Sequence, residues 1–179
     1  MGRSSRSRAT GTGSPSTRRC RPAGTPRSRR TSSSTPARAR PSAPARSGPT
    51  VASFLKNPPY PSFDLNQVVA VAKKYQGVPY RYGGENPSGF DCSGFTAYVY
   101  AQFGVALPHS SSRQGQGAGG GAVISPADAL PGDLVVMDGG GHVGIYLGGN
   151  MMIDAPYSGQ PVQVREIYNP SHWFVRYGI

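Results

Sequence analysis

The sequence predicts an α+β fold, because two helical segments precede a run of short strands. Apolar residues recur at helical spacing in 61–77 and again in 91–104. From residue 133 onward the apolar period changes to two, and turns rich in Gly, Pro and Asn separate the short segments. That second pattern is typical of an antiparallel sheet.

A change of composition near residue 50 divides the chain into two parts. The 179 residues carry 19 Lys and Arg against 8 Asp and Glu, a formal charge of +11. Twelve arginines and no acidic residue lie in 1–50, which is otherwise mainly Ser, Pro, Thr, Ala and Gly. Such a segment cannot bury enough apolar surface to offset its ordering entropy. We therefore expect 1–50 to be a disordered tail and 51–179 to be one nearly neutral domain.

The arginine-rich tail admits several interpretations. Its arginines would bind nucleic acid or an anionic surface by counterion release, although no aromatic residue interleaves them for base stacking. The plainer alternatives are a solvated linker, or an N-terminus assigned to the wrong start codon. The chain has no readable export signal and no run of 18 apolar residues that would span a membrane.

The first helix is expected within 61–77, with Asp64 as its N-cap. Residues 78–89 contain Pro, Gly and Asn, so they are expected to form a loop or a short extended segment. The second helix is expected within 91–104, with Asp91 as its N-cap and an apolar face behind it.

Residues 110–130 show little periodicity, and their glycine-rich centre at 115–121 predicts a mobile loop. This loop and its flanks are expected to border a substrate cleft. The change of period after this loop places strands at 133–138, 142–148, 151–155, 162–167 and 172–177.

The cysteines are Cys20 in the tail and Cys92 in the domain, so we expect no disulfide framework, metal cluster or cofactor. Cys92 stands at the first position of the second expected helix, where the backbone dipole favours a thiolate. A lone cysteine is more commonly a buried and inert residue. A core cysteine, however, has no reason to stand at a helix N-terminus.

The hairpin that follows residue 142 brings an acid to a histidine by register alone. If 148–150 form a three-residue loop, Ile145 faces Ile153, and every pair on that side of the hairpin is apolar. The other side then holds His142 and Asp154 as diagonal neighbours within reach of each other.

Gly144 leaves a bare patch beside His142, against which the helix that begins at Cys92 is expected to pack. That packing would bring a thiol, an imidazole and a carboxylate together as a triad. In it, Cys92 is the nucleophile, His142 the base and Asp154 the orienting acid. Each residue alone has a plainer interpretation, as an inert thiol, a surface histidine or an acid that serves the turn before Pro156. The joint arrangement favours catalysis.

Three blocks of the sequence resemble the NlpC/P60 cysteine peptidases of bacterial cell walls. The resemblance covers about residues 64 to 168 and implies a papain-like α+β core, with the nucleophile helix packed on an antiparallel sheet. In detail it is similar to the Rip-type wall hydrolases of actinobacteria. The blocks read PYRYGGENPSGFDCSGFTAYVY, LPGDLVVMDGGGHVGIYLGGNMMIDAP and GQPVQVREI.

The resemblance implies that Cys92 is the nucleophile and His142 the general base. The third polar residue falls on Asp154, where many members have His, and the tyrosine used near the oxyanion falls on Tyr80. A plain core role for Tyr80 is the alternative. The implied reaction is hydrolysis of peptidoglycan stem peptides, commonly between D-glutamate and meso-diaminopimelate, and it needs no metal.

The resemblance also implies a secreted or wall-associated protein whose partners are stem peptides. The charge of the twelve arginines alone suggests that the tail is a weak electrostatic tether to anionic wall polymers. A nucleic-acid partner is not expected, because 51–179 is nearly neutral. Three alternatives stay open. They are another papain-like amidase or acyltransferase, a non-catalytic wall-binding module, and an arginine-rich nucleic-acid binder that carries an unrelated domain.

Overall fold

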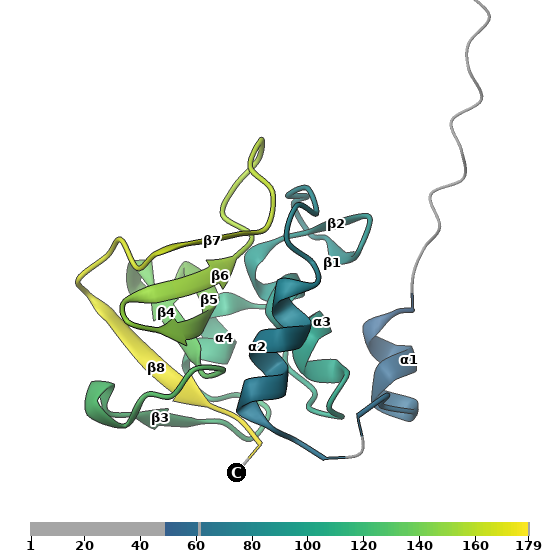
Figure 1. The fold of residues 1–179 in the computed structure, drawn as a ribbon, viewed down its shortest axis with the longest axis horizontal. Helices are drawn as coiled ribbons and strands as arrows, with labels where there is room; N and C mark the ends of the chain where they lie inside the picture. Colours follow the sequence, from purple (N-terminus) through teal and green to yellow (C-terminus); the bar gives the residue numbers. More distant parts are fainter. Residues whose placement is uncertain (1–48, 61, 179) are drawn as a thin grey trace, which may run out of the picture. The chain divides into compact units, whose positions relative to one another are not determined.

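The structure is a computed structural model that describes residues 49–60 and 62–178, so nearly all of the expected tail at 1–50 lies outside the described residues. Figure 1 follows the described chain from helices into strands. The helices are α1 (Val51–Lys56), α2 (Leu65–Lys73), α3 (Cys92–Ala101) and α4 (Ser111–Gly115), with 3₁₀ turns η1 (Pro126–Asp128) and η2 (Asp138–Gly140). The strands are β1 (Glu85–Asn86), β2 (Gly89–Phe90), β3 (Ala122–Ile124), β4 (Leu134–Met137), β5 (His142–Gly148), β6 (Met151–Asp154), β7 (Gln163–Glu166) and β8 (His172–Arg176).

The predicted α+β class is confirmed, and so are both N-caps that the sequence predicts. The Asp64 side chain accepts a hydrogen bond from the Asn66 N–H at the start of α2, and Asp91 does the same for Gly94 in α3. These acceptors satisfy N–H groups that a helix leaves unpaired in its first turn. Helix α1, which begins after the N-cap Thr50, was not predicted from the sequence.

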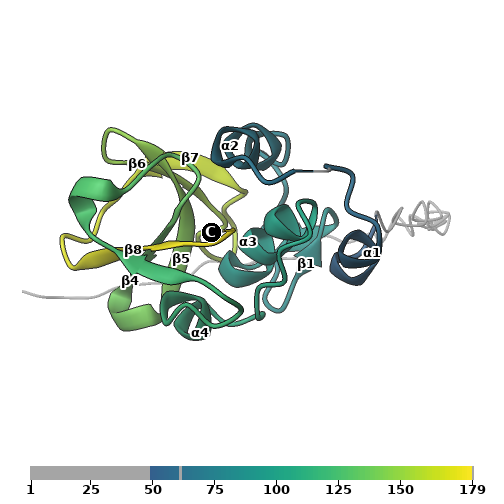
Figure 2. The same cartoon turned by 90° about the horizontal axis from the view of Figure 1, so that it is seen from below.

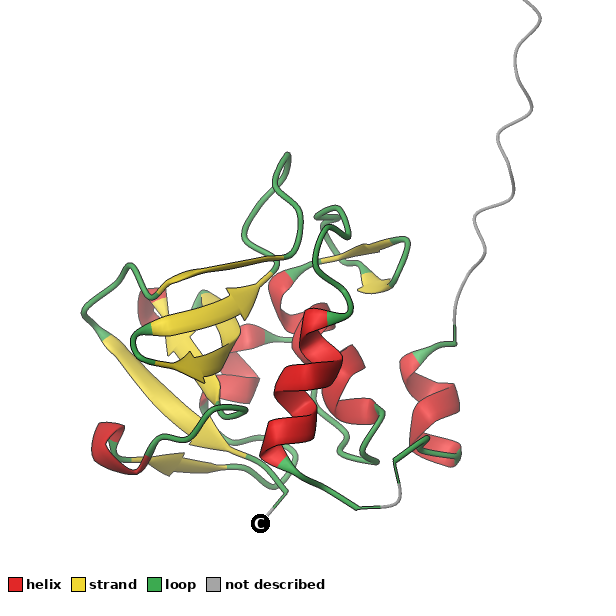
Figure 3. Ribbon diagram, in the orientation of Figure 1, coloured by secondary structure: helices red, strands yellow, loops and turns green. Residues whose placement is uncertain are grey.

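In the described part of the chain, six strands form one antiparallel sheet in the order β3-β8-β4-β5-β6-β7. Viewed from below, the strands curl around a common centre, and α2, α3 and α4 lie outside this curl (Figure 2). Figure 3 shows the same separation of helices and strands by colour. The sheet therefore has two faces, one toward the helices and one toward the inside of the curl.

The hairpin of β5 and β6 confirms the predicted pairing of Ile145 with Ile153, but the expected three-residue loop is wrong. Gly149 and Asn150 both have positive φ angles and form a two-residue turn, because a turn of this kind follows the twist of the strands. A bulge between Tyr146 and Gly148 takes up the extra residue, so the register nearer His142 is unchanged.

The two faces of the sheet carry separate apolar clusters. The outer cluster joins α2 and α3 to the sheet through Val68, Phe90, Phe95, Tyr98, Val99, Leu134, Val136, Val143, Ile145, Ile153 and Val175, among others. The inner cluster fills the curl with Val135, Met137, Met152, Ile167 and Phe174. Each fully buried large side chain contributes roughly 1.5–3 kcal/mol, so the sheet is held from both sides.

The prediction of a loop throughout 110–130 is wrong. Ser110 caps α4, and the buried Gln114 side chain donates to the Ser93 and Pro108 carbonyl oxygens at 3.0 and 2.8 Å. Farther along, β3 pairs with β8 as an edge strand. A helix this short has too few turns for an apolar period to show in the sequence, and tertiary hydrogen bonds hold it in place.

No helix within 49–60 and 62–178 is long and apolar enough to cross a bilayer.

Candidate active site

Cys92 occupies the first position of α3, and Asp91 fixes the chain immediately before it. The Asp91 carboxylate accepts hydrogen bonds from the N–H groups of Gly83 at 2.9 Å and Gly94 at 2.7 Å. One carboxylate therefore joins the approach loop to the first turn of the helix. Cys92 is a partly buried free thiol at the positive end of the helix dipole.

Beside this thiol, His142 begins β5 and contacts Asp154 at the end of β6. The distance from His142 Nε2 to Asp154 Oδ2 is 2.5 Å, and Asp154 is completely buried. Burial lowers the pKa of His142, but hydrogen bonds to Asp154 and Cys92 outweigh it and raise the pKa to about 9. The structure thus brings together the three residues that the sequence predicts.

The expectation that α3 covers the His142 face of the hairpin is wrong. Gly144 lies against β6, where an added Cβ would stand 3.1 Å from the Asp154 Cβ, so the neighbouring strand fills the bare patch. The helix packs on the opposite face, in the cluster that contains Val143 and Ile145. Cys92 meets His142 because both are the first residues of their elements and α3 packs against β5.

Arg165 in β7 is a site residue that the sequence analysis missed. Its Nε and Nη2 atoms donate to Asp154 Oδ1 at 2.9 Å and Oδ2 at 2.5 Å. Arg165 pairs with Met152, so it lies diagonally opposite Asp154. The alternation within VQVREI, read together with the register of β6, is the sequence signal that would have identified Arg165.

Tyr168 contacts Arg165, and Asp138 in turn contacts Tyr168. The Arg165 guanidinium carbon lies 4.8 Å from the centre of the Tyr168 ring, within the range of a cation–π contact. The Tyr168 hydroxyl donates to Asp138 at 2.5 Å, and burial followed by this bond raises the pKa of Tyr168 to about 12. This chain of contacts ties β7 to the turn that precedes His142.

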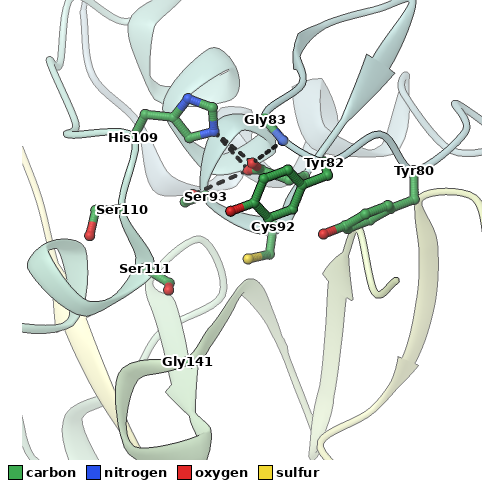
Figure 4. Close-up of a pocket in the computed structure, with 10 residues that line it drawn as sticks. Tyr80, Tyr82, Gly83, Cys92, Ser93, His109, Ser110, Ser111 and Gly141 are labelled. Atoms are coloured by element: carbon green, nitrogen blue, oxygen red, sulfur yellow. Dashed lines mark hydrogen bonds and ion pairs between the residues drawn. The ribbon is translucent and has the colours of Figure 1, made fainter. Parts of the chain in front are cut away.

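A pocket of about 470 Å³ opens over Cys92. Figure 4 shows the Tyr80 and Tyr82 rings above the Cys92 sulfur, with Ser110 and Ser111 to its left. The remaining lining residues are Gly83, Asp91, Ser93, His109 and Gly141.

Tyr80 is placed in this pocket beside Cys92. Burial, followed by the charge of Cys92, raises the pKa of Tyr80, so its hydroxyl stays protonated and able to donate. Of the segment expected to border the cleft, the flank at 109–111 lines the pocket, whereas 115–121 contributes no lining residue.

His109 is a second residue that the sequence analysis did not identify. Its Nε2 lies 2.9 and 2.8 Å from the two Asp91 carboxylate oxygens, and its Nδ1 lies 3.5 Å from Glu85. The imidazole therefore links the wall of the pocket to the residue before Cys92. Within the described residues, no three His, Cys, Asp or Glu side chains gather into a metal-binding cluster.

Comparisons with known proteins agree on this region. The model of the NlpC/P60 family matches residues 77–177. A probable endopeptidase p60 of Listeria seeligeri is 45% identical over 95 residues, which are 51% of this chain but 18% of that protein. This chain therefore spans less than a fifth of that relative's length.

This chain covers nearly the whole length of two related domains whose structures are solved. The NlpC/p60 domain of the peptidoglycan hydrolase SagA is 41% identical with a TM-score of 0.57, over 64% of this chain and 99% of that domain. RipD of Mycobacterium tuberculosis, described as a non-catalytic NlpC/p60 domain protein adapted to peptidoglycan binding, is 30% identical with a TM-score of 0.54, over 64% and 98%. The match of the family model over the region that holds Cys92, His142 and Asp154 means that this chain belongs to the NlpC/P60 family.

Proposed function

We propose that this protein is a cysteine endopeptidase that hydrolyses peptidoglycan stem peptides, with 51–179 as its catalytic domain. The observation that carries the proposal is the contact of His142 with both Asp154 and Cys92, at a thiol that opens into a pocket. A wall substrate places the protein outside the membrane. The name of the related p60 protein supports an endopeptidase activity, and that of the peptidoglycan hydrolase SagA supports a wall substrate.

In the first step, the Cys92 thiolate attacks the scissile carbonyl carbon, and the carbonyl π electrons move to oxygen. We assign the stabilisation of that oxyanion to the Cys92 N–H and the Tyr80 hydroxyl. As the C–N bond breaks, the His142 imidazolium gives its proton to the leaving amine. The products of this step are a Cys92 thioester and a free amine.

In the second step, neutral His142 takes a proton from water, and the hydroxide attacks the thioester carbon. The C–S bond then breaks, which releases the carboxylic acid and restores the thiolate beside the imidazolium. Asp154 holds the imidazole in one orientation and stabilises its charged form throughout. None of these steps requires a metal ion.

We propose the bond between D-glutamate and meso-diaminopimelate as the one cleaved. The proposed test incubates the protein with tripeptide and tetrapeptide stem fragments that contain diaminopimelate, followed by mass spectrometry of the products. Cleavage after glutamate, unchanged by EDTA, is the expected result. Cleavage at another amide would replace the proposed bond, and inhibition by EDTA would contradict the metal-free mechanism.

A second candidate is a non-catalytic peptidoglycan-binding module, which the similarity to RipD favours. The complete set of Cys92, His142 and Asp154 argues against it, because binding alone does not need a nucleophile beside a base. Intact stem fragments after incubation with a folded protein, together with retention on insoluble peptidoglycan, would favour this candidate.

A further inference from the structure

The Arg165–Asp154 contact has the planar two-point geometry that matches a guanidinium to a carboxylate. Arg165 Nε contacts both Asp154 oxygens, at 2.9 and 3.1 Å, and Nη2 contacts Oδ2 at 2.5 Å. The Oδ2 atom that receives Nη2 is the same atom that meets His142 Nε2. The fork therefore sets the position of the oxygen that orients the imidazole.

Burial makes this second partner of Asp154 necessary. The Asp154 side chain is fully buried, and a buried carboxylate that loses a cationic partner is strongly disfavoured. His142 cannot be that partner throughout a reaction cycle, because its charge is lost whenever it gives its proton away. Arg165 keeps its charge in every step, and Asp154 raises its pKa against the opposing effect of burial.

Several charged or titratable groups face His142. They come from separate elements: Cys92 from α3, Asp138 from η2, Asp154 from β6, Arg165 from β7, and Tyr168 from the segment after β7. Arg165 Nη2 lies 3.4 Å from His142 Nε2, so its charge opposes an imidazolium, whereas its hold on Asp154 favours one. These two effects have opposite signs and can be separated by experiment.

We infer that Arg165 is a positioning residue of the active site, which holds the Asp154 carboxylate against His142 and acts on Cys92 through that contact. The inference rests on the proposed cysteine chemistry and names a residue that supports it.

The chain offers a matched control in Arg176. This β8 arginine donates to the fully buried Asp133 from Nε at 2.8 Å and from Nη2 at 2.7 Å. The exposed fractions of the two arginine side chains are 26% for Arg165 and 24% for Arg176. Arg176→Gln therefore removes the same kind of buried ion pair, away from Cys92.

The test measures alkylation of Cys92 by iodoacetamide in the full chain, with peptide mapping to separate Cys92 from Cys20. In this reaction the thiolate forms a C–S bond as the C–I bond breaks and iodide leaves, so no peptide substrate is needed. Below about pH 7, where His142 is protonated, Arg165→Gln is expected to slow alkylation about tenfold. Arg176→Gln should stay within about twofold of the wild type.

A double-mutant cycle shows whether Arg165 affects the alkylation of Cys92 through Asp154. Asp154→Asn should also slow alkylation, and adding Arg165→Gln to it should change the rate by less than about twofold, because the shared contact is already lost. Arg165→Lys keeps the charge without the planar fork, so a rate about threefold below the wild type is expected. It also serves if Arg165→Gln fails to fold.

Faster alkylation in Arg165→Gln would mean that the charge of Arg165 acts directly on His142, and it would overturn the inference. Wild-type rates in Arg165→Lys, or fully multiplicative losses in the double variant, would overturn it as well. Intact stem peptides in the hydrolysis assay would instead count against the proposed function, because alkylation can follow the expected order without any hydrolysis.

Discussion

At the scale of single residues, the proposed chemistry rests on a carboxylate that contacts two cationic side chains. Asp154 meets His142 on one side and Arg165 on the other, and all three belong to neighbouring strands of one sheet. In a medium from which water is largely excluded, such contacts are worth more than they would be at the surface. This arrangement makes the contributions of the individual residues separable by substitution.

Asp154→Asn should be milder than His142→Ala. Removing the imidazole removes the general base and acid, and we expect a loss in kcat/KM of about 10³-fold. An amide at 154 can still accept from the imidazole, so the expected loss is about 10- to 100-fold, the range for a partner that orients a histidine. Steady-state hydrolysis of a stem peptide checks both values. Equal losses would show that Asp154 does more than orient the ring.

The raised pKa of His142 predicts a specific dependence of stability on pH. Burial lowers this pKa, but the bonds to Asp154 and Cys92 raise it from 6.5 to about 9. Because the folded value is the higher one, the contribution to folding is complete below about pH 6.5 and is lost as the pH rises through about 9. The raised pKa of His142 thus contributes about 3 kcal/mol to the free energy of unfolding at low pH.

Urea unfolding at several pH values tests this dependence, with His142→Gln as the control. The wild type should lose stability across that window, and the variant should lose much less. The alkaline limb of kcat/KM should fall in the same window, since the imidazolium that protonates the leaving amine disappears there. Stability that rises between these pH values would contradict the assigned charge state.

The sequence alone was enough to nominate Cys92, His142 and Asp154, because helix capping and apolar strand pairing restrict where these side chains lie. Their catalytic roles stay proposals. Arg165 and His109 escaped the same reasoning for a physical reason. Each contacts a partner on another element, and tertiary packing brings the two together.

At the scale of elements, the position of Cys92 depends on how closely α3 approaches the loop before it. The Asp91 N–H donates to the Gly84 carbonyl at 2.9 Å, and Gly94 lies so near that a Cβ there would stand 2.0 Å from the same oxygen. Glycine at this position therefore permits a backbone approach that no other residue allows.

Gly94→Ala should displace the start of α3 and lower both stability and activity. Overpacking of this kind costs about 3 kcal/mol or more when backbone must move, and a shift of about 1 Å at the nucleophile lowers the rate by about 10²-fold. Thermal unfolding and peptide hydrolysis measure the two effects. Gly77→Ala is the control, because its Cβ would meet nothing within 4 Å and the cost there is limited to the positive φ. A fully active Gly94→Ala variant would show that the close approach is not needed.

The expected strands from residue 133 onward agree with the structure to within one residue at either end, because the Gly-, Pro- and Asn-rich turns between them mark where each strand stops. The segment 110–130 was misjudged, since α4 and β3 are short and are held by contacts with distant residues. Local sequence carries little information about such elements. The same reason explains why α1 was not predicted.

At the scale of the whole chain, the proposed division near residue 50 separates an arginine-rich segment from the proposed catalytic domain. Twelve arginines lie in 1–50, and the remainder carries seven basic and eight acidic residues. Thr50 caps α1, so a deletion that respects the domain removes 1–48.

Deletion of 1–48 should leave kcat/KM on a soluble stem peptide within about twofold of the full chain, because the proposed catalytic residues all lie in 51–179. Retention on immobilised polyphosphate should fall, and for the full chain it should weaken steeply as salt rises. A salt titration of retention compares the two proteins. Retention of the full chain that does not respond to salt would contradict the electrostatic role of the tail.

The central claim is that Cys92 is the nucleophile of peptide hydrolysis. The most direct measurement is stem-peptide turnover by the full chain and by Cys92→Ala, followed by mass spectrometry, with circular dichroism to show that both proteins fold. The account predicts cleavage after glutamate by the wild type and intact peptide with the folded variant. Cleavage at the wild-type rate by Cys92→Ala would contradict it.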